Sequence, residues 1–220
     1  MASQLIDPPK IRTLADLLER LGGISPGRVL YDPSPGKATE ADLIDIQKKE
    51  NRLCELVDGV LVEKAMGYRE SCLALALAAF LRSFVVPRNL GLVSGADGTI
   101  RLFPGLVRIP DVAFISWARL PNRKMPTVPI PHLAPDLAVE VMSESNTEKE
   151  MARKLQEYFN CSVSLVWLVE PDARTVAVHT SPEAYTLLNE AQTLHGDPVL
   201  PGFQLPLPDL FAELDRHGKE

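Results

Sequence analysis

The segment from residue 136 to residue 169 constrains the fold more than any other part of the sequence. It contains two apolar runs, DLAVEVM at 136–142 and SLVWLV at 164–169, with the length and composition of interior strands. Between them, Thr147 and Glu150 have the spacing of a capping box, which predicts a helix running to Phe159. A strand, a helix and a second strand in this order predict an α/β domain with helices packed on a sheet.

Patterns on both sides of this unit predict further helices and strands. An Asp-Gly pair between two apolar runs predicts a β-hairpin at 54–63. Repeated prolines predict a long irregular loop at 117–135, and the tail after residue 200 is expected to be extended and to end in a polar turn. We therefore expect one mixed sheet in a domain at 51–220, preceded by a helical N-terminal extension and linker at 1–50. Further helices are predicted at 13–23, 38–51 and 67–86, and further strands at 92–94, 98–103, 107–116, 175–179 and 184–188.

The overall composition narrows the class of protein. The chain has 220 residues, of which 45% are hydrophobic, so one domain with a sizeable core is expected. It shows no secretion signal and no apolar run long enough to cross a bilayer, so we expect a soluble, cytoplasmic protein. The three cysteines and four histidines lack zinc-site spacing, and no P-loop, dinucleotide-binding or serine-hydrolase motif is present.

Two acidic residues stand out because they lie against apolar strands. Glu140 interrupts the run DLAVEVM, where a carboxylate is costly to bury without a partner or a metal. Asp111 follows Pro110 at the head of the apolar stretch 112–115. Carboxylate oxygens are the ligands that Mg²⁺ prefers, so the pair predicts a metal site. The alternative is that Glu140 forms a salt bridge and that neighbouring acids, such as Asp136, only end strands.

A metal-dependent hydrolase also needs a cation near the phosphate, and two lysines on the predicted helix compete for this role. Lys154 borders the apolar stripe formed by Met151, Leu155 and Tyr158, whereas Lys149 points away from it. We therefore favour Lys154, although it could instead pair with Glu150 on a solvated face. Tyr158 and the strand residue Trp167 are assigned to packing, while Ser143 and Ser145 could orient a water or simply form a turn.

These features, in this order, resemble the PD-(D/E)XK nuclease superfamily and, more closely, its bacterial branch called the Uma-two family. The resemblance covers about residues 50 to 211. The segments that carry it are ELVDG at 55–59, PDVAFI at 110–115, PDLAVEV at 135–141, Lys154 with Tyr158, WLVEP at 167–171 and LPGF at 200–203.

The resemblance implies a restriction-endonuclease-like α/β fold, a mixed β-sheet flanked by helices. It makes Asp111 and Glu140 the ligands of Mg²⁺ or Mn²⁺, Lys154 the catalytic lysine and Glu55 a possible third acid; Glu55 could equally be a polar strand position. It also implies that the protein is an endonuclease acting on double-stranded DNA, and we expect a homodimer. One departure matters: the superfamily places its lysine two residues after the acid, and that position holds Met142 here.

Other functions are left open by the sequence. The net charge of −6 and the absent lysine at Met142 also fit a catalytically weak or inactive domain that binds nucleic acid or oligomerises. A carboxylate-pair glycosidase would leave Lys154 unexplained and would have few aromatic platforms at 6% aromatic content. The locally basic segment 101–124 could contact phosphates or could be an ordinary charged surface; its basic residues are Arg101, Arg108, Arg119, Arg123 and Lys124.

Overall fold

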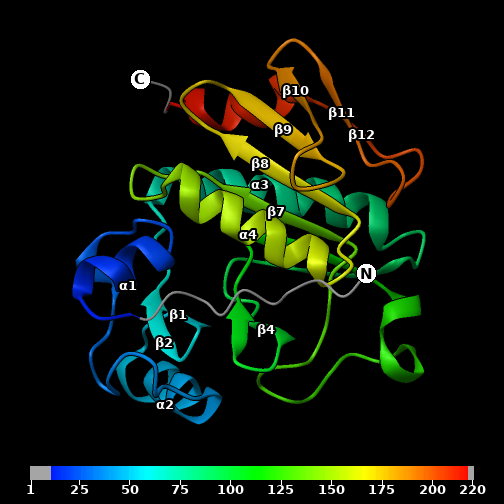
Figure 1. Cartoon of the computed structure of the whole chain (residues 1–220). Helices are drawn as coiled ribbons and strands as arrows, with labels where there is room; N and C mark the ends of the chain where they lie inside the picture. The colour runs from blue at the N-terminus through cyan, green and yellow to red at the C-terminus, as the bar shows by residue number, and fades with distance from the viewer. Residues whose placement is uncertain (1–10, 218–220) are drawn as a thin grey trace, which may run out of the picture.

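A mixed six-stranded sheet with helices on both faces forms the centre of the protein (Figure 1). The computed structural model describes residues 11–217. Helix α4 lies against one face of this sheet and helix α3 against the other. The sheet has the order β10-β9-β8-β7-β6-β3, in which only β7 and β8 run parallel. Its strands are β3 (Gly91–Ser94), β6 (Val112–Ser116), β7 (Leu137–Val141), β8 (Leu165–Glu170), β9 (Thr175–His179) and β10 (Tyr185–Asn189).

Four of the helices within residues 11–217 begin and end close to the positions that the sequence predicts. The N-caps Thr13 and Thr39 each form a complete capping box, so α1 and α2 start where a side chain satisfies their free amide groups. Helix α4 starts after Thr147, whose hydroxyl accepts a hydrogen bond from the Glu150 amide. The helices are α1 (Leu14–Arg20), α2 (Glu40–Glu50), α3 (Tyr68–Val85), α4 (Glu148–Asn160) and α5 (Leu207–Phe211).

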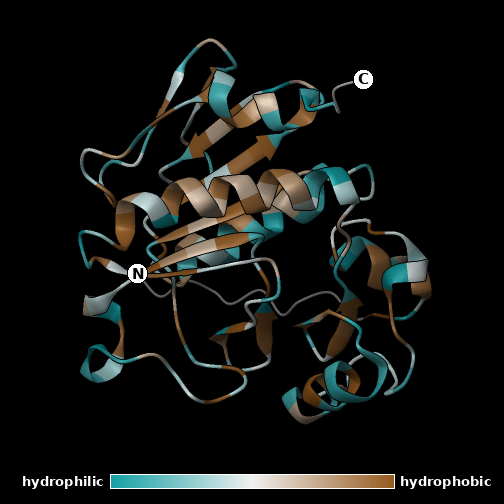
Figure 2. Ribbon diagram, turned by 180° about the vertical axis from the view of Figure 1, so that it is seen from behind, coloured by the Kyte–Doolittle hydropathy of each residue, from teal (hydrophilic) through white to brown (hydrophobic). Residues whose placement is uncertain are grey.

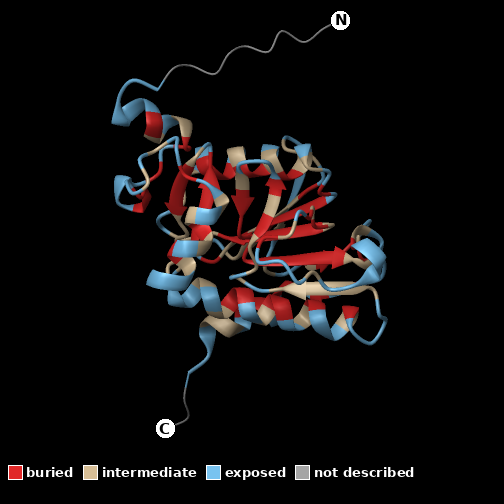
Figure 3. Cartoon of the chain, turned by 90° about the horizontal axis from the view of Figure 1, so that it is seen from below, coloured by how far each residue is buried: buried red, intermediate tan, exposed pale blue. Residues whose placement is uncertain are grey.

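Alternation along β7 divides the core between the two faces of the sheet. Leu137 and Val139 face α3 and α5 in the larger apolar cluster. Ala138 faces α4 and packs near Leu155 and Tyr158 in a second cluster. Glu140 follows Ala138 on this second face, and it is therefore buried beneath α4. In Figure 2 the apolar colour runs along α3 and the central strands, and Figure 3 shows these strands as buried.

The expectation of one mixed sheet is wrong, because the strands of residues 11–217 form three sheets. The predicted strand at 107–116 is two strands, β5 and β6, which belong to different sheets. Between them Pro110 cannot donate to a strand ladder, and the chain changes sheet at this point. The four-stranded sheet β2-β1-β5-β4 contains β1 (Cys54–Val57), β2 (Val60–Glu63), β4 (Ile100–Phe103) and β5 (Leu106–Arg108).

The N-terminal segment packs on this smaller sheet and reaches α4. Residues of α1 and α2 form apolar clusters with the β1–β2 hairpin. Gly22 has a φ of +98° and lies so close to α4 that an added Cβ would meet the Cα of Glu150 at 2.6 Å. Glycine is the residue that tolerates both conditions. This close approach fixes the start of α4 against the N-terminal segment.

The C-terminal part has more regular structure than the sequence indicates. The tail after residue 200 is extended as far as strand β12 (Gln204–Pro206), which pairs with β11 (Thr193–His195) in a short two-stranded sheet, but helix α5 then follows instead of further extended chain. Its apolar side chains, Leu207, Leu210 and Phe211, are fully buried against the α3 face, which explains why a short helix forms there. No helix within residues 11–217 is both long and apolar enough to cross a bilayer.

Candidate active site

The four residues singled out from the sequence come together beneath α4. Glu140 lies near the end of β7, and Asp111 lies at the junction between β5 and β6. Glu55 comes from β1, in the smaller sheet, and Lys154 comes from the middle of α4. All four are buried, with exposed fractions of 1–4%. The site is therefore built where the two sheets and α4 meet.

Glu140 is held by two donors from α4. Its Oε2 atom lies 3.1 Å from the Nζ atom of Lys154, and its Oε1 atom accepts a hydrogen bond of 2.6 Å from the Tyr158 hydroxyl. Because Lys154 and Tyr158 are four residues apart on one helix, they reach the same carboxylate. Tyr158, which the sequence analysis assigned to packing, therefore also contacts the candidate site.

Glu55 is the centre of a network of buried charges. Its Oε1 atom lies 3.4 Å from Lys154 Nζ and accepts a 3.1 Å hydrogen bond from the Ile109 amide. Its Oε2 atom accepts a 2.6 Å hydrogen bond from Arg108, which also donates to Glu157. These contacts do not fit the alternative that Glu55 is an ordinary polar residue of a strand. Glu55 connects the lysine of α4 to the smaller sheet.

Asp111 is contacted by a lysine that the sequence analysis did not identify. The Nζ atom of Lys64 lies 2.8 Å from Asp111 Oδ1, and the Lys64 side chain is 5% exposed. The other carboxylate oxygen, Oδ2, accepts a 2.6 Å hydrogen bond from the Val141 amide, next to Glu140. This bond ties the β5–β6 junction to the end of β7 and brings the two acids to the same place.

The burial of these groups shifts their acid–base properties. Burial is the main cause that raises the pKa of Glu140; the charges of Asp111 and Glu55 add to it, and Lys154 opposes it. Burial alone would lower the pKa of Lys154, but the charges of Glu140 and Glu55 outweigh this and raise it. Burial and the Glu140 charge raise the pKa of Tyr158 well above its usual value. Lys154 thus stays cationic and Tyr158 stays a donor.

The stability contributed by Glu55 should depend on pH. Burial alone would raise the pKa of Glu55, but Lys154, Arg108 and the Ile109 amide lower it from 4.5 to about 2. A depressed carboxyl pKa stabilises the fold above the unfolded value and loses this effect as the pH falls towards the folded value. We predict that wild type exceeds Glu55→Gln in unfolding free energy at pH 7, and that about 3 kcal/mol of this difference disappears between pH 4.5 and 2.

Urea unfolding of both proteins across this pH range measures the difference directly. Titrating groups remote from Glu55 are common to the two proteins and cancel, whereas the pKa of Glu140, which the Glu55 charge raises, changes together with Glu55. A difference that stays constant down to pH 2 would contradict the assignment of Glu55 as an ionised partner of Lys154 and Arg108.

The acidic side chains at the site are of the type that binds a divalent cation. Asp111 and Glu140 are oxygen donors, and Mg²⁺ binds through one or two carboxylates while keeping several waters. Asp111 Oδ1 is buried and, within residues 11–217, makes no hydrogen bond of normal geometry despite its ion pair with Lys64. In the same residues, no three His, Cys, Asp or Glu side chains gather into a metal-binding cluster. The two carboxylates are therefore the available ligand set.

A cleft of 850 Å³ lies beside the site, between the starts of α3 and α4. Lys64 and Met142 line it, so it reaches the residues next to Asp111 and Glu140. Ser143 also lines it, and its hydroxyl contacts Asn146 and Ser145 in the turn before α4. The charged side chains described in its lining are mostly acidic: Lys64, Arg69, Glu70, Glu144, Glu148, Glu170 and Asp172.

The structure separates other sequence candidates from the site. Lys149 is exposed and pairs with Glu19, so it does not reach Glu140. Asp136 directly precedes β7 and accepts hydrogen bonds from the Ser116 amide and from Arg119. This is expected for an acid at one end of a strand. Trp167 is fully buried in the core, which agrees with its assignment to packing.

The basic residues of the segment 101–124 have different surroundings in the fold. Arg101 pairs with Glu40, and Arg108 is buried between Glu55 and Glu157. Arg119 pairs with Asp136, at the opposite end of β7 from Glu140. Three of the five basic residues are thus paired with acidic side chains, and only Arg108 is buried. For these three residues, pairing within the fold is favoured over contact with phosphates.

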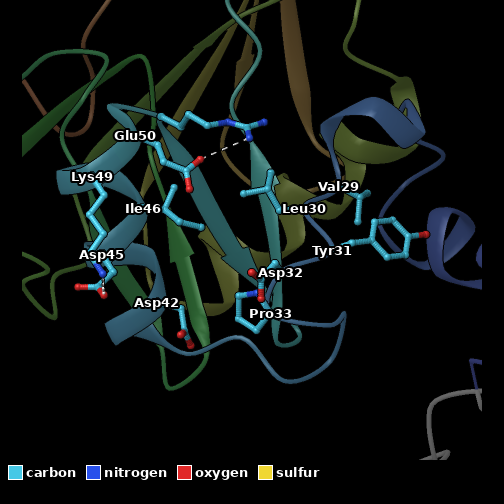
Figure 4. A pocket seen from close by; sticks show the side chains of 11 residues that line it. Val29, Leu30, Tyr31, Asp32, Pro33, Asp42, Asp45, Ile46, Lys49 and Glu50 are labelled. Carbon is cyan, nitrogen blue, oxygen red and sulfur yellow. Dashed lines mark hydrogen bonds and ion pairs between the residues drawn. The ribbon is translucent and has the colours of Figure 1, made fainter.

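Another hollow, of 540 Å³, lies away from the site (Figure 4). It is formed by α2 and the chain at 29–33, and acidic side chains such as Asp42 and Asp45 lie around it. Lys49 pairs with Asp45 beside it. None of the four candidate site residues lines this hollow. The 850 Å³ cleft, in contrast, is lined by Lys64, which pairs with Asp111.

Taken together, the sheet flanked by helices and the buried carboxylates with a lysine define a nuclease-like α/β protein. The sequence model of the Uma2 (Uma-two) family, described as "putative restriction endonuclease", matches residues 41–208. The chain belongs to this family, and the membership supports a nuclease function.

A solved structure supports the fold independently. It is described as a putative nuclease belonging to DUF820 from Anabaena variabilis. The two chains are 20% identical, with a TM-score of 0.64, and the similarity covers 73% of this chain and 90% of that chain. At this identity the similarity shows the restriction-endonuclease-like fold class alone. Comparison with curated protein sequences gave no significant match.

Proposed function

We propose that this protein is a divalent-metal-dependent endonuclease that hydrolyses phosphodiester bonds of double-stranded DNA. The observation that carries the proposal is the meeting of Asp111 and Glu140 at the end of β7, with the Lys154 ammonium 3.1 Å from Glu140. Asp111 and Glu140 would hold Mg²⁺ or Mn²⁺, which supplies an activated water and neutralises charge on the phosphate. The family membership supports a nucleic-acid substrate.

The protein's own residues have distinct tasks in this proposal. Lys154 keeps its positive charge and would stabilise the negative charge that develops at the phosphate. Glu55, whose Oε1 atom lies 3.4 Å from Lys154 Nζ, acts as a positioning residue for this lysine. The Tyr158 hydroxyl orients Glu140 through Oε1. Because cutting both strands of a duplex needs two sites or two successive events, we further propose that the protein acts as a homodimer.

A second candidate function is a catalytically inactive domain that binds nucleic acid or oligomerises. The mostly acidic lining of the cleft favours it, because acidic side chains repel a phosphate backbone. The two functions differ in an observable way, since only the first requires metal-dependent cleavage.

The two lysines of α4 allow a matched test of the proposed function. We predict that Lys154→Met lowers the rate of supercoiled-plasmid cleavage in Mg²⁺ by about 10²-fold or more, because a cation at the phosphate is lost. Lys149→Met removes the same charge from the surface of the same helix and should cleave like wild type. Circular dichroism checks that each variant is folded at the assay temperature. Equal cleavage by both variants would contradict the role of Lys154.

A further inference from the structure

The charges around the candidate site balance without a metal. Its three acids are Glu55, Asp111 and Glu140. Within residues 11–217, the cations in contact with them are Lys64, Arg108 and Lys154; Arg108 is shared with Glu157, which has a further cation in Arg153. A divalent cation would therefore add two positive charges to a site that already contains its own counter-ions. Movement of one of these cations away from the site would remove repulsion and favour binding.

Lys64 is the cation best placed to move. Arg108 is also held by Glu157, and Lys154 lies between Glu55 and Glu140. Among residues 11–217, Lys64 pairs with one carboxylate, Asp111, and its hydrogen bonds go to the backbone oxygens of Ala96 and Ile109. A carbonyl oxygen carries no full charge, so these two contacts hold the ammonium less strongly than a second carboxylate would.

The space next to Lys64 can receive the displaced side chain. Lys64 lines the 850 Å³ cleft and also a separate hollow of 330 Å³. Its four-carbon stem has several freely rotating bonds, so the ammonium can turn into the cleft without movement of the backbone. In the cleft it would meet acidic side chains such as Glu70 and Glu144.

We propose that Lys64 is the resident counter-ion of Asp111 in the metal-free protein and that a divalent cation displaces it into the cleft. This inference rests on the proposed function only in taking Asp111 as a metal ligand. Lys64 and the metal compete for Asp111 Oδ1, the buried oxygen that makes the ion pair but no hydrogen bond of normal geometry within residues 11–217. Lys64 thus neutralises the negative charge of Asp111 when no metal is bound.

Mn²⁺ binding, measured by isothermal titration calorimetry, tests the competition without any cleavage assay. Lys64→Gln keeps a donor for the carbonyls of Ala96 and Ile109 but removes the charge beside Asp111. We expect it to bind Mn²⁺ at least about tenfold more tightly than wild type. Arg69→Gln removes a charge from the cleft that pairs with Asp172 rather than Asp111, and its affinity should stay within about twofold of wild type.

A second variant covers the case in which Lys64→Gln folds poorly. Lys64→Met removes the charge but keeps the length of the side chain, and it should also bind Mn²⁺ at least about tenfold more tightly than wild type, whereas Lys64→Arg keeps a cation and should bind Mn²⁺ like wild type. Equal Mn²⁺ affinity in wild type and Lys64→Gln, or an equal gain in Arg69→Gln, overturns the inference but leaves the proposed function intact. If neither wild type nor Lys64→Gln binds Mn²⁺, both the inference and the proposed function are overturned.

Discussion

Replacement of Asp111 by Asn should reduce metal-dependent plasmid cleavage by at least about 10³-fold. Asn has the shape of Asp, and its side-chain oxygen can still accept the hydrogen bond from the Val141 amide. What it lacks is the negative charge that faces Lys64 and that would bind the metal. The variant therefore isolates the charge of Asp111 from its structural contact with β7.

Asp172→Asn is the matched control for this prediction. Asp172 lines the cleft and pairs with Arg69, so the control removes one carboxylate from the same surface without touching Glu140. Both proteins should be assayed well below their melting temperatures. Cleavage by Asp111→Asn at more than a tenth of the wild-type rate would show that Asp111 is not a metal ligand.

Replacement of Arg28 by Met should destabilise the fold by about 3–5 kcal/mol. The guanidinium group of Arg28 makes two hydrogen bonds, of 2.8 and 3.0 Å, to the carboxylate of Glu150 on α4. The two side chains are 10% and 3% exposed. Without Arg28, the Glu150 charge stays buried with Asn146 as its remaining side-chain donor among residues 11–217. Unfolding in guanidinium chloride, followed by circular dichroism, measures the loss of unfolding free energy.

The double variant Arg28→Met/Glu150→Met shows whether the uncompensated charge is the cause. Two apolar side chains of similar volume leave no buried charge, so the double variant should recover most of the stability lost by Arg28→Met. If the double variant is less stable than Arg28→Met alone, packing of the N-terminal segment rather than charge pairing explains the loss.

The central unit of the fold could be predicted from local sequence patterns. The two apolar runs at 136–142 and 164–169 form the parallel pair β7 and β8, and the capping box at Thr147 starts α4. Both signals are local and depend on neighbouring residues. The split of 107–116 between two sheets was not predictable in the same way, because it depends on which distant strands pair with each half. The domain division at residue 50 stays a prediction.

The sequence predicts those residues of the candidate site at which an acidic side chain lies among apolar neighbours. Glu140 and Asp111 stand out for this reason, and periodicity of the helix distinguishes Lys154 from Lys149. Lys64 gave no such signal, because it follows a strand at a position where a lysine is normally exposed. Its contact with Asp111 depends on the placement of the β1–β2 hairpin against the β5–β6 junction, which is a tertiary property.

Supercoiled-plasmid cleavage by the wild-type protein, with and without divalent metal, tests the central claim most directly. The account predicts nicked or linear DNA in Mg²⁺ or Mn²⁺, no cleavage in EDTA, and recovery of cleavage when metal is added in excess of EDTA. Wild-type protein that is folded and leaves the plasmid intact in both metals, or that cleaves equally in EDTA, would contradict the proposal that Asp111 and Glu140 form a metal-dependent nuclease site.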